Sequence, residues 1–293
     1  MTFEMLYDLL IGPFAEFEFM RRALVGAVAI ALGGAPVGVF LMLRRMSLTG
    51  DAMAHAILPG AALGYLVAGL SLPAMTLGGI LAGIVVAVLA GLVARVTVLK
   101  EDASLAAFYL ISLALGVTLV SAKGSNVDLL HVLFGTVLAL DDLALLLLAS
   151  IATVTLATLA VLYRPLVLEC VDPVFLRSVS RAGGPTHLVF LGLVVLNLVG
   201  GFQALGTLLA VGLMMLPAAA SRFWSADVTA MIAIATVIGI ASALCGLLLS
   251  YHAELPSGPA IILTAGGAYL ISMVIGREGG LLWLARPGKH LEA

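Results

Sequence analysis

Long apolar stretches, separated by short polar segments, follow one another along almost the whole of this sequence. An α-helix needs about 20 mostly apolar residues to cross a bilayer. Segments of this character lie at 19–43, 52–70, 73–98, 104–122, 142–163, 186–202, 204–221, 227–250 and 259–276. Gly200 and Gly201 mark either a turn between the spans 186–202 and 204–221 or a break in one bent helix. The pattern predicts an all-α fold, a polytopic membrane helical bundle of eight or nine transmembrane helices.

A shorter apolar stretch covers residues 129–140. It is too short to span a bilayer as a helix, so we expect a re-entrant or broken segment that protein or water covers. No linker, repeat or soluble domain interrupts the pattern. The sequence therefore predicts a single transmembrane domain over residues 1–293.

The composition agrees with lipid as the surrounding solvent. Hydrophobic residues form 62% of the chain and charged residues 10%, whereas soluble domains carry about 25% charged residues. A net charge of −2 and three lysines argue against nucleic acid as a partner. The first ten residues contain Glu4 and Asp8 where a secretory signal has basic residues, so we expect the first apolar segment to remain in the mature protein.

The basic residues predict the orientation of the spans. When the 44–50 turn is placed in the cytoplasm, eleven of the fourteen lysines and arginines fall on the cytoplasmic side, as the positive-inside rule requires. Arg21, Arg22 and Lys123 fall outside. Either Arg21 and Arg22 reach the outer headgroups along their aliphatic stems, or the first helix begins later than residue 19.

Asp51 and His55 are the most informative polar residues, because they lie beside or within a predicted span. A spacing of four places both on one face of a helix. A carboxylate and an imidazole form half of a tetrahedral zinc site, and they also suit Mn²⁺ or Fe²⁺. In the competing interpretation, Asp51 caps the second helix and His55 is a hydrogen-bonded core histidine. Asp128 and His131 are further candidates for a metal pathway, although a lone histidine in an apolar stretch is also compatible with a buried structural role.

The segment after residue 168 encodes a short helix between two spans. Asp172 is a suitable N-cap, Pro173 suits the first helical position, and Gly183 suits the position after the helix. Phe175 and Leu176 contribute to an apolar stripe. Such a stripe fits either a docking helix for another protein or a helix that lies on its own bundle.

The chain lacks the P-loop pattern G-x-x-x-x-G-K-[ST] and the H-E-x-x-H pattern of zinc proteases. We therefore expect no nucleotide site of this type and no enzyme activity of its own.

These features together resemble the membrane permease family of bacterial zinc, manganese and iron ABC importers, which includes the zinc-uptake permease of enteric bacteria. The resemblance extends over nearly the whole chain, and its order and spacing are specific. The segments that carry it are Arg44-Arg45-Met46-Ser47, Gly50-Asp51, Ala54-His55, Val127-Asp128-Leu129-Leu130, Leu133-Phe134-Gly135, Asp172-Pro173, Phe175, Gly206-Thr207-Leu208-Leu209, Leu216-Pro217-Ala218-Ala219-Ala220 and Pro256-Ser257-Gly258-Pro259.

The resemblance implies a homodimeric permease of the bacterial cytoplasmic (inner) membrane, with a cytoplasmic ATPase and an extracytoplasmic metal-binding protein as partners. It implies that Asp51 and His55 contact the passing metal and that no cofactor is bound permanently. The loop helix 173–182 then corresponds to the coupling helix of the family. The residues expected to dock the ATPase are Asp172, Pro173, Phe175, Leu176, Arg177 and Gly183.

Two positions depart from the family pattern. Thr136 replaces the Asp, Asn or Ser that is common in relatives, and position 131 is a histidine. The added imidazole favours zinc as the cargo, with manganese next. Two alternatives stay open at this stage, an intramembrane metalloenzyme and a proton-driven secondary transporter.

Overall fold

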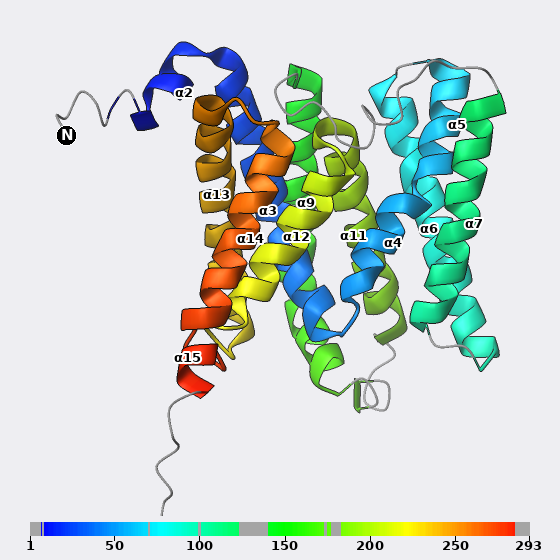
Figure 1. Ribbon diagram of the computed structural model, residues 1–293. Helices are drawn as coiled ribbons and strands as arrows, with labels where there is room; N and C mark the ends of the chain where they lie inside the picture. The colour runs from blue at the N-terminus through cyan, green and yellow to red at the C-terminus, as the bar shows by residue number, and fades with distance from the viewer. Residues whose placement is uncertain are drawn as a thin grey trace, which may run out of the picture.

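The structure is a computed structural model that describes residues 7, 9–69, 71–98, 101–122, 140–172, 175–176 and 183–284. The described residues form a bundle of helices (Figure 1). Their bounds are α2 Gly12–Glu16, α3 Glu18–Leu43, α4 Ser47–Ala56, α5 Leu58–Ala68, α6 Leu72–Val96, α7 Glu101–Ala122, α9 Asp142–Val171, α11 Gly183–Leu205, α12 Thr207–Ser221, α13 Val228–Ala253, α14 Ser257–Ile275 and α15 Leu281–Leu284.

The predicted fold class is confirmed, although the number of spans was set slightly high. Among the described residues, seven helical segments are long and apolar enough to cross a membrane, and α4 and α5 together form one of them. Two further apolar helices are shorter, Ala103–Leu119 and Thr207–Ser221. Of the predicted stretch 129–140, residues 129–139 lie outside the described part of the chain.

Local sequence signals explain several of the helix boundaries. Asp141 caps α9, since its Oδ1 accepts a hydrogen bond of 2.8 Å from the backbone N–H of Ala144. Asp227 caps α13 through Ala230 in the same way. The helix continues through Gly200 and Gly201 and ends instead before Gly206, whose φ of +91° is open to glycine but strained for other residues. The turn between α11 and α12 therefore lies at Gly206.

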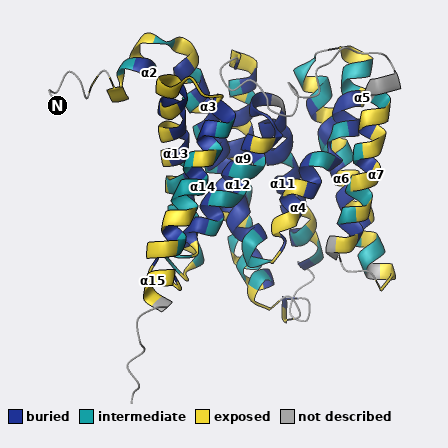
Figure 2. Cartoon of the chain, in the orientation of Figure 1, coloured by how far each residue is buried: buried dark blue, intermediate teal, exposed yellow. Residues whose placement is uncertain are grey.

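Helices α3 and α11 form the centre of the bundle. In α3, 72% of the apolar stretch is buried, and in α11 67%, whereas only 28% is buried in α6, α9 and α14. Figure 2 shows the same contrast between a buried centre and exposed outer faces. Because a soluble protein would not expose this much apolar surface, the outer helices require lipid or another protein chain against them.

The second span bends between α4 and α5. Ile57 separates the two helices, and Pro59 at the start of α5 has no N–H to donate to the preceding turn. Helix α5 packs so closely on α6 that a methyl group on Gly60 or on Gly78 would collide with the other residue's carbonyl. Glycine thus permits backbone-to-backbone packing on the far side of the bend.

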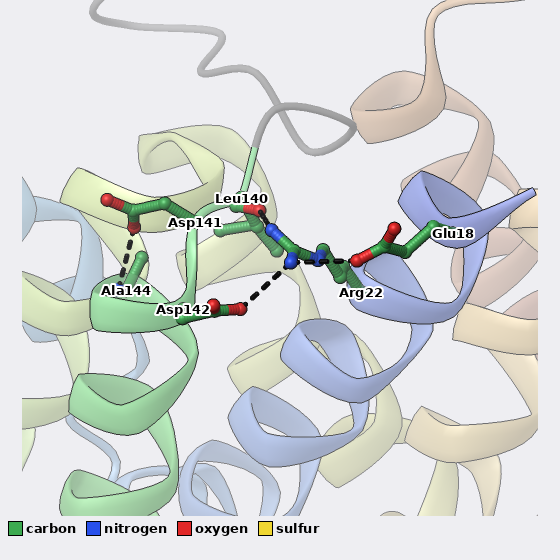
Figure 3. A network of polar contacts seen from close by, with 6 residues as sticks. All are labelled: Glu18, Arg22, Leu140, Asp141, Asp142 and Ala144. Atoms are coloured by element: carbon green, nitrogen blue, oxygen red, sulfur yellow. Dashed lines mark hydrogen bonds and ion pairs between the residues drawn. The ribbon is translucent and has the colours of Figure 1, made fainter.

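Arg22 lies near the start of α3 in a network that joins this helix to α9 (Figure 3). Its Nη2 lies 2.8 Å from Glu18 Oε1 and 3.0 Å from Asp142 Oδ1, and its Nη1 donates to the Leu140 carbonyl at 3.4 Å. Arg21 donates to the carbonyls of Phe14 and Ala15. The helix begins at Glu18, so both arginines belong to its first turns and are compensated there. We call this the outer end of α3, and the end at Arg44, which the charge bias assigns to the cytoplasm, the inner end.

Candidate functional site

Helix α4 brings Asp51 and His55 together as the spacing predicted. Asp51 Oδ1 and His55 Nε2 are 3.9 Å apart, which exceeds a hydrogen-bond distance. Two ligand bonds of about 2.1 Å each can join atoms up to about 4.2 Å apart, so one ion can contact both groups. The pair faces the side of α4 that is open, with 66% of the Asp51 side chain and 27% of the His55 side chain exposed.

The competing interpretation of these two residues is not supported by their surroundings. Helix α4 begins at Ser47, so Asp51 lies in its second turn and does not cap it. His55 Nδ1 is buried and has no hydrogen-bond partner among the described residues. Its ring centroid lies 6.3 Å from that of Tyr109 on α7. His55 is therefore held by packing, and it is not a fully hydrogen-bonded core histidine.

The exposed face of α4 continues toward the inner end. Leu48, Asp51 and His55 follow the helical spacing of three and four residues, and Leu48 is 81% exposed. The opposite face, with Ala52 and Met53, is buried against the neighbouring helices. Within the described part of the chain, no group of three or more histidine, cysteine, aspartate or glutamate side chains is placed to hold a metal ion. Asp51 and His55 are thus two candidate ligands, and the described residues of this chain place no third one beside them.

The other predicted candidates divide into residues that the structure describes and residues that it does not. Asp128, His131, Thr136, Pro173 and Arg177 lie outside the described residues. Asp172 does cap the short segment after α9, since its Oδ1 accepts from the Phe175 N–H at 2.8 Å. Phe175 is 51% exposed and Leu176 only 5%. Gly183 is the first residue of α11.

Sequence reasoning missed a buried charged cluster at the inner end. Arg44 Nη2 lies 2.7 Å from Glu169 Oε1 and 2.5 Å from His187 Nδ1. The Arg44 guanidinium also lies 4.9 Å from the ring centroid of Phe190. The signal in the sequence is Glu169 itself, because an acidic residue at the end of an apolar segment requires a partner. Its partners lie 125 and 18 positions away, beyond the reach of local patterns.

Comparison with known proteins gives one consistent result. The profile of the ABC 3 transport family matches residues 16–276. The manganese import system permease protein ScaB of Streptococcus parasanguinis is 32% identical over 260 residues, which cover 89% of this chain and 91% of that protein. The manganese transport system membrane protein MntC of Listeria monocytogenes is 31% identical over 268 residues, 92% and 94% of the two chains. A chain of PsaBC from Streptococcus pneumoniae, solved in complex with Fab, superposes with a TM-score of 0.83 at 29% identity, covering 94% of this chain and 98% of that one.

Proposed function

The chain belongs to the ABC 3 transport family, and from this premise we propose that it is the permease subunit of an importer that carries Mn²⁺ across the bacterial inner membrane. Asp51 and His55 contact the ion on its way. No cofactor is held permanently, and the metal is the cargo.

The exposed carboxylate of Asp51 is the observation that carries this proposal. It lies within a membrane-spanning segment, yet 66% of its side chain is exposed. A charged group in contact with lipid tails is costly, and such groups face a bundle interior or a water-filled cavity. The open face of α4 therefore lines a polar passage.

We propose that a second copy of the chain completes this passage. A divalent transition metal takes four to six ligands, whereas one α4 supplies two. A twofold axis beside α4 doubles the set and covers Leu48 with its own symmetry mate. Two ligands from each copy give a site that holds the ion without a permanent cage, which suits a step that must release it.

Manganese replaces zinc as the favoured cargo. The expectation of zinc depended on His131, which lies outside the described residues. The relatives described above are named for manganese, and a mixed set of carboxylate and imidazole ligands suits this ion.

The energy for transport comes from a separate subunit, because the sequence lacks a P-loop. We place the docking surface for that ATPase at the segment after α9, where Asp172 caps the backbone and Phe175 is exposed. An extracytoplasmic metal-binding protein delivers the ion at the outer end.

Uptake of radioactive Mn²⁺ by cells that contain the complete transporter tests the metal contacts. Asp51→Asn and His55→Gln keep the size of each side chain and should lower uptake by about tenfold or more, with the amount of permease in the membrane unchanged. Asp142→Asn is the matched control, because it removes a carboxylate at the outer surface. Uptake in the first two variants equal to that of the control would falsify the assignment.

Competition distinguishes the ions in the same cells. Excess unlabelled Mn²⁺ should abolish the labelled uptake, and an equal excess of Zn²⁺ should leave most of it. The reverse order would show that zinc is the cargo.

Co-purification tests the docking surface. Phe175→Asp places a charge on the exposed apolar ring and should release the ATPase from the permease, whereas Phe175→Tyr keeps the ring and should retain it. Retention of the ATPase by both variants would place the docking surface elsewhere.

A further inference from the structure

The chain turns from α3 into α4 through a short corner that backbone hydrogen bonds hold in one conformation. Arg45 N–H donates to the Met42 carbonyl at 3.0 Å, and Met46 N–H donates to the Leu41 carbonyl at 2.9 Å. These are the two bonds of a Schellman motif. Arg45 occupies the left-handed position with a φ of +58°, and α4 begins two residues later. A displacement of Arg44 therefore reaches the start of the helix that carries Asp51 and His55.

The segment after α9 is equally close to Glu169. Asp172 N–H donates to the Leu168 carbonyl at 2.9 Å and ends α9. Asp172 then accepts from Phe175 N–H through its side chain and from Leu176 N–H through its carbonyl, at 2.8 and 3.2 Å. Leu176 is buried, which anchors this turn against the bundle. Asp172, which holds the docking segment through these bonds, is therefore less than one helical turn from Glu169 in the sequence.

The two short paths meet in the buried pair of Arg44 and Glu169. Their side chains are only 8% and 7% exposed, so water cannot readily replace either partner when the other moves. The contact uses one atom from each group, and among the described residues Arg44 Nη1 and Glu169 Oε2 have no hydrogen-bond partner. The forked guanidinium can thus form a second, parallel bond after a small shift of α9.

We propose that the Arg44–Glu169 pair is the link that transmits movement of the docking segment to α4, and hence to the metal contacts. Arg44 and Glu169 act as positioning residues through Asp51 and His55. This inference rests on the proposed function. It names the contact through which ATP hydrolysis in the partner subunit changes the metal path in this chain.

The test measures the number of Mn²⁺ ions transported per ATP hydrolysed by the complete transporter in proteoliposomes. Glu169→Gln keeps the side-chain shape but removes the charge that holds Arg44. The ratio should fall by about five- to tenfold while ATP hydrolysis continues, in the range expected for residues on a coupling path. A purely structural role would lower transport and hydrolysis together, in proportion to the folded protein.

The matched control is Asp142→Asn, which removes an ion pair between the same two helices at the outer end and should leave the ratio within about twofold. If Glu169→Gln does not accumulate, Arg44→Lys takes its place, because it keeps the charge and loses the fork. A ratio unchanged in the folded variant overturns the inference. Absence of Mn²⁺ transport by the unmodified protein would instead overturn the proposed function.

Discussion

Ion pairs join α3 to α9 at both ends of the two helices, in opposite surroundings. At the outer end Arg22 contacts Asp142 and Glu18, whose side chains are 86% and 66% exposed. At the inner end Arg44 contacts Glu169, and both side chains are almost fully buried. The outer cluster balances a charge that the orientation of the chain places on the unfavourable side of the membrane. The inner cluster fixes the distance between the inner ends of α3 and α9, because neither buried ion has water as a substitute partner.

The largest effect should follow from removing one buried ion. Glu169→Ala leaves Arg44 charged and without its carboxylate, so we expect a loss of about 3–5 kcal/mol in the free energy of unfolding. Thermal unfolding of the purified permease in detergent measures this change. Glu18→Ala, which removes an exposed carboxylate from the outer cluster, serves as the control. A similar small loss in both variants would remove the distinction between the two ends.

A smaller loss should follow from His187→Ala. The imidazole Nδ1 lies 2.5 Å from Arg44 Nη2, and a buried donor that loses its acceptor costs about 1–3 kcal/mol. His187→Gln retains an acceptor and should recover part of this loss. Equal unfolding temperatures for the two variants would show that packing, and not the hydrogen bond, accounts for the role of His187.

The outer cluster should respond to salt and the inner one should not. Arg22→Ala should cost about 0–1 kcal/mol at low ionic strength, as exposed pairs do. The difference from the unmodified protein should vanish near 1 M salt, where the Debye length is about 3 Å. A loss that persists at high salt would mean that Arg22 acts by packing.

The smallest expected effect is at the inner corner itself. Arg45 has a φ of +58°, which costs about 1–2 kcal/mol for a residue with a Cβ. Arg45→Gly relieves this cost, but glycine also raises the conformational entropy of the unfolded chain, which opposes folding. We therefore expect a net stabilisation of only about 0.5 kcal/mol. A destabilised variant would show that the Arg45 side chain makes a compensating contact.

The sequence predicts most of the bundle, because every helix that crosses the lipid needs about 20 mostly apolar residues. Apolar length identified the helices, and the spacing of Asp51 and His55 predicted their shared face. Helix boundaries were less accurate, because the second span was predicted to begin at residue 52 whereas α4 begins at Ser47. Within this segment Thr49 and Gly50 are buried among other helices, whereas Asp51 is exposed on the open face of α4.

Other polar residues show why single positions are harder to interpret. Asn197 is a polar residue within a predicted span, and its amide donates to Thr155 Oγ1 and the Leu193 carbonyl within the bundle. His252, which follows the predicted span 227–250, lies in the last turn of α13 with its Nε2 3.0 Å from the Leu9 carbonyl oxygen. Their partners lie on other turns or helices, so tertiary packing decides between a structural and a functional role.

The close packing of Gly60 against Gly78 has a mechanical consequence. It holds the outer half of the second span in place, because α5 cannot slide over α6 without a collision between the two backbones. The inner half has no such anchor on α6, and the missing N–H of Pro59 weakens the joint between the halves. Any tilt of this span would therefore be concentrated near Ile57, and Asp51 and His55 both lie on the inner side of that bend.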